Sequence, residues 1–192
     1  MQRLNLFKVQ QILGKTIFTH QDLVAGFGVN KRAVEAFLSY NYRMGKIQRV
    51  RRGLYFFTGE TIDTFSLANV IYAPSYISLE TALSFYGLIP EVVYSVTSIT
   101  TRATREFVFN DINYSYQSIK IKAFTGYIPI DRDNKKILMA TPEKALADYY
   151  YFVSLGKKTA NDRINIDKID KKILKNYLSL YDRQKLLANY CH

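Results

Sequence analysis

Residues 30–57 read NKRAVEAFLSYNYRMGKIQRVRRGLYFF, and the fold predicted for the N-terminal part of the chain follows mainly from these residues. Its first half repeats apolar residues at helical spacing, and those expected on the buried face are Val34, Phe37 and Leu38. Asn30 is a favourable helix cap, so a helix should run from there to about Met44. The second half is β-branched and aromatic on both sides of Arg51-Arg52-Gly53, which predicts a short hairpin over residues 46–57.

The outward face of the predicted helix is small and basic. At about 100° per residue, the residues opposite the buried face are Arg32, Ala36, Ser39 and Arg43. Such a stripe suits a helix that enters a nucleic-acid groove better than one that only faces water. The candidate DNA-binding residues are Asn30, Lys31, Arg32, Ser39 and Arg43 on the helix, and Lys46, Arg49, Arg51 and Arg52 on the hairpin.

Two shorter helices are expected before residue 30. The first spans about residues 5–13, where apolar residues recur at helical spacing. The second begins at Thr19, because a threonine with an acid three residues later, here Asp22, is typical of a helix N-terminus. Three helices followed by a basic hairpin predict a winged helix-turn-helix domain over residues 1–58.

Residues 59–192 are expected to form a second, α+β domain. The expected helix starts are Asp63, Ser78 and Thr141. The β-branched and aromatic runs over residues 95–124 predict an antiparallel meander of three or four strands, and residues 137–139 predict a further strand. Two terminal amphipathic helices are expected, one with Ile169, Ile173 and Tyr177 and one with Leu186, Leu187 and Tyr190. The predicted fold class of the whole chain is therefore α+β.

Charge is distributed unevenly along the chain, which has 27 lysines and arginines against 16 acidic residues and a net charge of +11. Residues 1–58 hold ten basic and two acidic residues, residues 59–156 eight and ten, and residues 157–192 nine and four. Clustering of basic residues at the N-terminal end favours binding to a polyanion. Two alternatives stay open: the lysines serve solubility, above all after residue 156, or the winged helix binds a protein instead of DNA.

Three segments, in this order behind the predicted winged helix, carry a resemblance that covers roughly residues 10–155. They are RRGLY (51–55), PSYISLETALSFYGLIPE (74–91) and TPEKALADYYY (141–151). Together they resemble the AbiEi family of antitoxins, which belong to bacterial abortive-infection (phage-defence) systems of toxin-antitoxin type IV. The resemblance implies an N-terminal domain that binds double-stranded DNA at inverted repeats and represses transcription of its own operon. It also implies a C-terminal antitoxin domain that counters a cognate nucleotidyltransferase toxin without forming a stable complex, and it supplies no catalytic residue and no cofactor.

The sequence gives less support to a metal site or to an enzyme. His20, His192 and Cys191 are too few and too far apart to predict a zinc site. Glu143, Lys144 and Asp148 are the residues closest to a nuclease set, but we expect the lysine and the acids to pair on a helix surface, and we expect no enzymatic activity. The alternatives are a winged-helix repressor whose second domain senses a ligand or dimerises and, less favoured, an enzyme that processes nucleic acid.

Location is also suggested by the sequence. The first residues lack the apolar core of a signal peptide, and no stretch approaches the ~18 apolar residues that a membrane helix needs. A single cysteine forms no internal disulfide, so nothing indicates an oxidising compartment. We therefore expect a soluble, cytoplasmic protein with no membrane partner, no metal and no cofactor.

Overall fold

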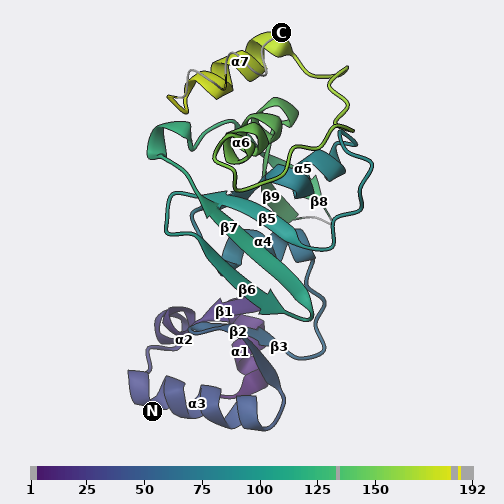
Figure 1. Ribbon diagram of the computed structural model, residues 1–192. Coiled ribbons are helices and arrows are strands. Elements are labelled where there is room, and N and C mark those ends of the chain that lie inside the picture. Colours follow the sequence, from purple (N-terminus) through teal and green to yellow (C-terminus); the bar gives the residue numbers. More distant parts are fainter. Residues whose placement is uncertain (1–3, 133–134, 183–185, 187–192) are drawn as a thin grey trace. The chain divides into compact units, whose positions relative to one another are not determined.

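A computed structural model describes residues 4–132, 135–182 and 186 (Figure 1). They form a mixed α+β structure with two sheets, as the sequence predicts for the fold class. The chain divides into two compact units, Met1–Asp63 and Thr64–His192. In the described part of the chain, no helix has the length and apolar character to cross a membrane.

The first unit combines three helices with a small antiparallel sheet. Its elements are α1 (Leu6–Leu13), β1 (Ile17–Thr19), α2 (His20–Phe27), α3 (Lys31–Arg43), β2 (Ile47–Arg51) and β3 (Leu54–Phe57). The strands lie in the order β1-β3-β2. The three expected helices and the expected hairpin are therefore confirmed. Strand β1 is not predicted, since three residues are too few to show an alternation of apolar and polar positions.

Capping side chains fix where the helices of the first unit begin. At α2 the Thr19 hydroxyl accepts a hydrogen bond from the backbone N–H of Asp22, and the Asp22 carboxylate accepts one from the N–H of Thr19. This reciprocal pair is a capping box. At α3 the side-chain oxygen of Asn30 accepts from the N–H of Ala33 at 2.9 Å. Both caps lie where the sequence predicts them.

The helices of the first unit pack onto the sheet through one apolar core. Its buried residues include Val9, Phe18, Leu23, Phe27, Val34, Phe37, Leu38, Ile47 and Phe57. The rings of Phe18 and Phe57 stack with their centroids 4.5 Å apart, which ties β1 to β3. The face of α3 expected to be buried is confirmed, so its orientation on the sheet follows from the apolar spacing.

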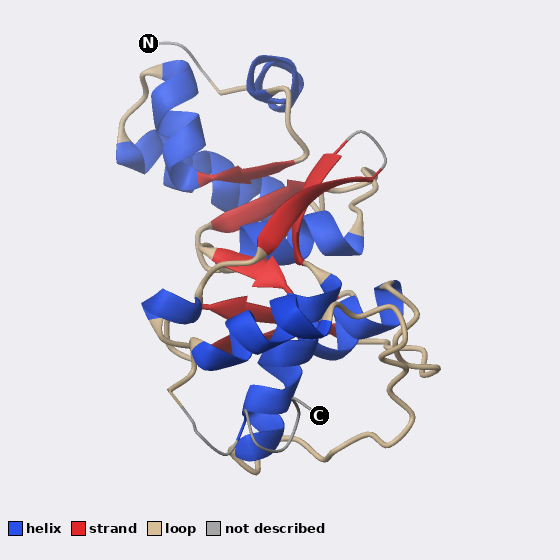
Figure 2. Ribbon diagram, turned by 90° about the horizontal axis from the view of Figure 1, so that it is seen from above, coloured by secondary structure: helices blue, strands red, loops and turns tan. Residues whose placement is uncertain are grey.

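The second unit is built on a six-stranded mixed sheet, drawn in red in Figure 2 with helices packed against it. Its elements are α4 (Thr64–Ile71), β4 (Ser75–Ile77), α5 (Leu79–Phe85), β5 (Val96–Thr100), β6 (Arg105–Phe109), β7 (Ile112–Ser118), the 3₁₀ turn η1 (Ile121–Ala123), β8 (Tyr127–Arg132), β9 (Lys135–Ala140), α6 (Pro142–Ser154) and α7 (Lys171–Ser179). The strand order is β6-β7-β5-β4-β9-β8.

Helices lie on both faces of this sheet. The Tyr116 hydroxyl on β7 donates to the carbonyl of Ala68 on α4 at 2.6 Å. The Tyr76 hydroxyl on β4 donates to Asp148 on α6 at 3.0 Å. Strand β5 lies between β4 and β7, and in the register of these three strands Tyr76 lies level with Gln117. Tyr76 and Gln117 therefore point to one face of the sheet, and Tyr116, the neighbour of Gln117, points to the other. Helices α4 and α6 therefore cover opposite sides, and α7 packs on α6.

The expected antiparallel meander is wrong. Strands β6 and β7 do form an antiparallel hairpin, but β5 pairs with β7 in parallel, with Ser98 opposite Tyr116. The chain leaves β5, forms β6 at the edge of the sheet, and returns through β7 between them. Residues 119–124, expected as a further strand, contain η1 instead, and the pairing with β5 ends where the N–H of Ile119 donates to the carbonyl of Thr100.

Strand β9 includes the strand expected at residues 137–139, whereas β4 and β8 are not predicted. Helix α7 is one of the two terminal helices expected, but it buries Leu174 and Leu178 and leaves Ile173 exposed. The other, expected around Leu186, Leu187 and Tyr190, falls largely outside the described residues.

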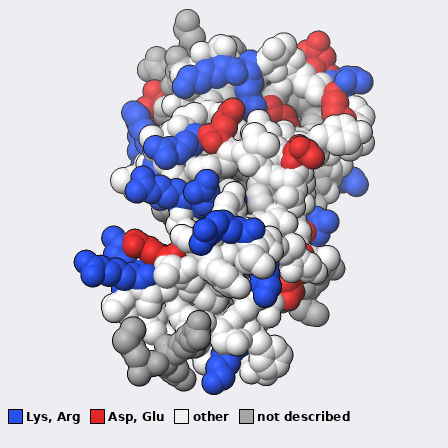
Figure 3. Space-filling model, turned by 90° about the horizontal axis from the view of Figure 1, so that it is seen from below, with Lys and Arg blue, Asp and Glu red and all other residues white. Residues whose placement is uncertain are grey.

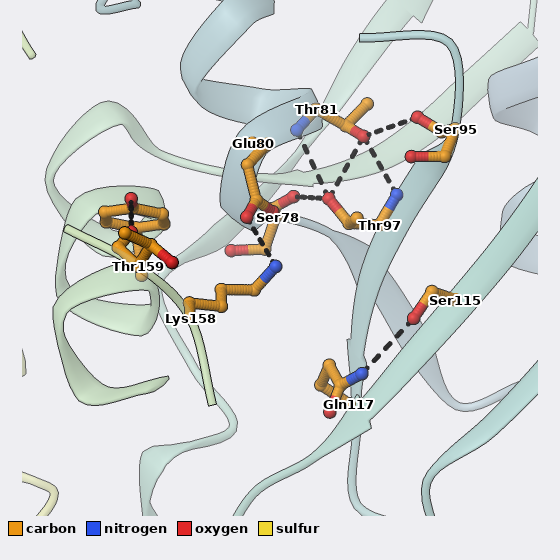
Figure 4. Close-up of polar contacts among 10 residues, drawn as sticks. Ser78, Glu80, Thr81, Ser95, Thr97, Ser115, Gln117, Lys158 and Thr159 are labelled. Carbon is orange, nitrogen blue, oxygen red and sulfur yellow. Dashed lines mark hydrogen bonds and ion pairs between the residues drawn. The ribbon is translucent and has the colours of Figure 1, made fainter. Parts of the chain in front are cut away.

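Threonine side chains anchor the start of α5 to β5 (Figure 4). The N–H of Thr81 donates to the Thr97 hydroxyl at 3.2 Å, and the N–H of Thr97 donates to the Thr81 hydroxyl at 2.8 Å. The Thr97 hydroxyl in turn donates to the carbonyl of Ser78 at 2.7 Å. These buried bonds hold the first turn of α5, where the fully buried Leu79 has a φ of +57°, a strained value for a residue other than glycine.

Candidate nucleic-acid interface

The outward face of α3 is a basic stripe, here defined as Arg32, Ala36, Ser39 and Arg43. All four residues are exposed, and they lie opposite the side chains that pack on the core. Asn41 joins the buried face, where its side-chain amide donates to the carbonyl of Phe37 at 2.8 Å. Because the opposite side of α3 packs on the apolar core, its stripe faces away from the unit.

The two candidate residues at the start of α3 have partners already. The side-chain oxygen of Asn30 accepts the capping hydrogen bond from Ala33, so its NH₂ group is the part left to contact a ligand. The ammonium of Lys31 lies 3.8 Å from the carboxylate of Glu35, and both side chains are exposed. An exposed pair of this kind contributes little stability, so Lys31 can exchange Glu35 for a phosphate at small cost.

The β2–β3 hairpin carries Arg49, Arg51 and Arg52 around its turn. The turn needs Gly53, which has a φ of +80°. The Arg51 guanidinium donates to the carbonyl of Arg52 at 2.9 Å, so it braces the turn, whereas the side chain of Arg52 is exposed. The Arg49 guanidinium lies 5.7 Å from the ring centroid of Tyr42 on α3. The hairpin and the end of α3 are therefore in contact.

Lys46 lies apart from the other candidates. It precedes β2 and lines a groove between α1 and α3, on a different side of α3 from Arg49. The structure thus brings the helix residues and the hairpin arginines onto adjoining surfaces and leaves Lys46 in the groove.

The candidate surface has few carboxylates to neutralise it. Asp22 binds Lys15 at 2.6 Å, and Glu35 lies near Lys31. Burial raises the pKa of Asp22, but hydrogen bonds from Lys15 and Thr19 outweigh it and hold the pKa below its ordinary value. Among the described residues, the cations that form no ion pair with a carboxylate include Arg32, Arg43, Lys46, Arg49 and Arg52. Figure 3 shows a face of the molecule with more lysine and arginine than acidic side chains.

A second cluster of chemistry-bearing residues lies inside the second unit. Lys144 and Asp148, one turn apart on α6, are fully buried and form an ion pair. The Asp148 carboxylate also accepts hydrogen bonds from the hydroxyls of Tyr76, Ser78 and Tyr181. The expected surface pairing of these residues is therefore wrong. The signal for burial is the apolar run Ala145–Ala147 between them, which places both on a helix that faces a core.

Burial governs ionisation in this cluster. It raises the pKa values of Tyr76 and Tyr181 well above the ordinary tyrosine value, and the nearby Asp148 charge adds to the shift. Burial also lowers the pKa of Lys144, while Asp148 opposes that change. The tyrosines therefore stay protonated and donate to Asp148. The side chains come from residues 74–91 and 141–151, the two longer segments of the AbiEi resemblance, and from Tyr181.

Ser78 shows how this cluster replaces an ordinary cap. It lies at the N-cap position of α5, as the sequence predicts, but its side chain makes no capping bond. Its hydroxyl donates instead to Asp148 at 2.7 Å. The polar side chain that predicts the helix start is therefore used to connect α5 to α6.

In the described ranges, no three His, Cys, Asp or Glu side chains gather closely enough to hold a metal ion. Both a scan against models of known protein families and a search of curated proteins gave no match to this chain.

Proposed function

We propose that this chain is a DNA-binding transcriptional regulator whose first unit is a winged helix-turn-helix domain. The element order α1-β1-α2-α3-β2-β3 and the strand order β1-β3-β2 support this assignment. In it, α3 is the recognition helix and the β2–β3 hairpin is the wing. The single observation that carries the proposal is the basic stripe, an exposed helix face whose arginines have no described carboxylate partner.

The residues divide into two roles on DNA. In this assignment Arg32, near the start of α3, reads base edges in the major groove, where arginine pairs best with guanine. Arg43, at the other end of the helix, and Arg52, at the turn of the wing, bind phosphates and set the register of the protein on the duplex. Ser39 lies between the two arginines and contacts either a base or a phosphate.

DNA binding is tested by fluorescence anisotropy on the segment upstream of the chain's own gene and on a scrambled duplex of equal length. The intact chain should prefer the upstream segment, and the double variant Arg32→Ala/Arg43→Ala should lose that preference. Lys8→Ala is the matched control, because Lys8 is an exposed cation on α1 outside the stripe. Equal binding by wild type and double variant overturns the proposal.

The resemblance to AbiEi antitoxins supports a more specific role. In that role the chain represses its own operon and counters a nucleotidyltransferase toxin without a stable complex. No cofactor takes part. Co-expression with the nucleotidyltransferase encoded beside it should relieve growth arrest. Growth arrest that persists would leave a winged-helix repressor whose second unit senses a ligand or dimerises.

The second unit is proposed to act without catalysis. Lys144 and Asp148, the residues nearest to a nuclease set, are fully buried and cannot contact a substrate in this conformation. Metal-dependent cleavage of DNA or RNA by the purified chain would contradict this assignment.

A further inference from the structure

A groove of about 950 Å³ runs between α1 and α3 of the first unit. Its two rims carry large aromatic side chains, Phe7 on α1 and Tyr40 on α3, which are 65% and 53% exposed. Its α3 wall is formed partly by two small residues one turn apart, Ala33 and Ala36. The proposed function uses only the outward stripe of α3 and leaves most of this groove without a role.

The shape of the groove favours a helix over a small molecule. Ligand pockets for small molecules enclose most of the ligand surface, whereas here the aromatic rims stand largely in solvent. A third helix laid between α1 and α3 would cover both rims at once. Small residues let helix axes approach closely, and Ala33 and Ala36 supply them on the α3 side.

The basic side chains around the groove indicate the charge of the partner. Lys46 is the one charged side chain among the described residues that line it, and the exposed Arg32 and Arg43 flank Ala36 along the stripe. A second copy of this chain would bring an equally basic unit to the same place, since residues 1–58 hold ten basic and two acidic residues. The basic residues of the two copies would repel each other across the contact. A partner with acidic side chains is attracted instead.

We propose that the groove between α1 and α3 binds an amphipathic helix of a partner protein, whose apolar side packs against Phe7 and Tyr40 and whose flanks are acidic. Its carboxylates lie near Lys46 on one side and the basic stripe on the other. Because Ala36 belongs both to the groove and to the stripe, a bound helix covers part of the surface proposed to contact DNA. The partner therefore displaces DNA, a consequence that rests on the proposed function, whereas docking itself does not.

The probe is a synthetic peptide of about 14 residues, long enough for four turns, held helical by a side-chain link on its outer face. It carries leucines at i, i+3, i+4 and i+7 and glutamates on the flanks. A second peptide has lysine at each glutamate position. The full chain should bind the glutamate peptide with a dissociation constant on the order of 10⁻⁵ M and the lysine peptide at least tenfold more weakly.

Matched variants locate the binding site. Phe7→Ala and Tyr40→Ala should each weaken peptide binding about tenfold, because each removes an aromatic anchor. Ile12→Ala on α1 and Tyr42→Ala on α3 are the controls, since Ile12 and Tyr42 are 53% and 51% exposed and lie outside the groove. All four side chains are exposed, so none of the changes should unfold the unit. Equal effects of test and control variants overturn the proposal.

Two further measurements separate the possible failures. Sedimentation velocity of the chain alone should show a monomer, and a dimer that Phe7→Ala dissociates would assign the groove to a second copy instead. Addition of the glutamate peptide should release labelled operator DNA from the wild-type chain and not from Tyr40→Ala. Peptide binding without any DNA binding upholds the docking site and overturns the proposed function. DNA binding without peptide binding does the reverse.

Discussion

The two units of the chain treat charged side chains in opposite ways. In the first unit, Arg32, Arg43 and Arg52 are exposed and have no carboxylate partner among the described residues. In the second unit, Lys144 and Asp148 are fully buried, and Asp148 receives hydrogen bonds from three hydroxyls besides the ion pair. One set of charges is open to a ligand and the other is satisfied internally.

Exposed and buried charges contribute to different properties of the protein, binding and stability, for a physical reason. An exposed cation is solvated, so its removal costs the fold little, and its interaction energy is available to a binding partner. A buried ion pair has lost its water, so each member depends on the other and on the hydroxyls around it. We therefore expect mutations of these exposed arginines to change binding without changing stability, and mutations of the buried pair to do the opposite.

Asp148→Ala is expected to have the largest effect of any single charge removal. It leaves the buried Lys144 ammonium without its counter-ion and the hydroxyls of Tyr76, Ser78 and Tyr181 without this acceptor. Breaking a buried pair from one side costs about 3–5 kcal/mol, so the free energy of unfolding of the second unit should fall by that amount. Urea unfolding measures the loss, and hydrogen exchange assigns it to residues 64–182.

The double variant Lys144→Met/Asp148→Leu is the control for this prediction. It removes both charges and refills their volume with apolar atoms, so it should recover the part of the loss that comes from the unpaired Lys144 charge. The hydroxyls of Tyr76, Ser78 and Tyr181 still lack their acceptor, so recovery should be incomplete. A loss in Asp148→Ala below about 1 kcal/mol would mean that the pair is hydrated in solution, and the contrast between the units would fail.

Arg32→Ala tests the other side of the comparison. It should leave the free energy of unfolding unchanged, because the side chain is exposed and forms no ion pair with a described carboxylate. Operator binding should weaken by about 1–3 kcal/mol, and the preference among bases at one position should relax. Anisotropy titrations against a set of single-base operator variants measure both. A uniform loss over all sequences would assign Arg32 to a phosphate instead of a base.

The three helices and the hairpin of the first unit could be predicted from its sequence because their signals are local. Thr19 and Asp22 form the expected capping box, and Asn30 caps α3 as expected. The buried side of α3 follows from the spacing of apolar residues within one helix, and so does the outward position of the basic stripe. The groove with α1 could not be predicted in the same way, because it depends on how two helices pack in space.

The second unit shows where such reasoning fails. Parallel pairing of β5 with β7 depends on contacts between segments that local patterns do not record, so a run of strand-like segments predicted a meander instead. A charged pair on a helix was expected at the surface, and the buried Lys144 and Asp148 contradict that expectation. The hydrogen bonds that Lys144 and Asp148 need when buried come from Tyr76 and Tyr181, which are distant in sequence and close only in the folded unit.

Asp22→Ala tests a charge of intermediate burial. It removes one half of the capping box at α2 and the ion pair with Lys15, so stability at neutral pH should fall by about 1 kcal/mol. Because the pKa of Asp22 is lowered in the folded state, this contribution is present above its ordinary pKa. It is lost as the pH falls below about 4, where wild type and variant should converge in urea titrations. Glu35→Ala, which breaks only the exposed pair with Lys31, should show neither effect.

Arg52→Ala should have the smallest effect and gives the sharpest evidence of what the exposed charges do. A side chain that only neutralises a phosphate contributes through the release of a bound counterion, so its loss should weaken binding to every sequence equally. The slope of log affinity against log salt concentration should become shallower by about one unit. Stability should not change, since the side chain is exposed at the turn.

Arg51→Ala is the informative neighbour, because it also removes the bond that braces the turn and should lower the stability of the hairpin. If Arg52→Ala leaves the salt slope as it is, the turn of the hairpin does not contact the DNA backbone, and Arg52 serves solubility instead.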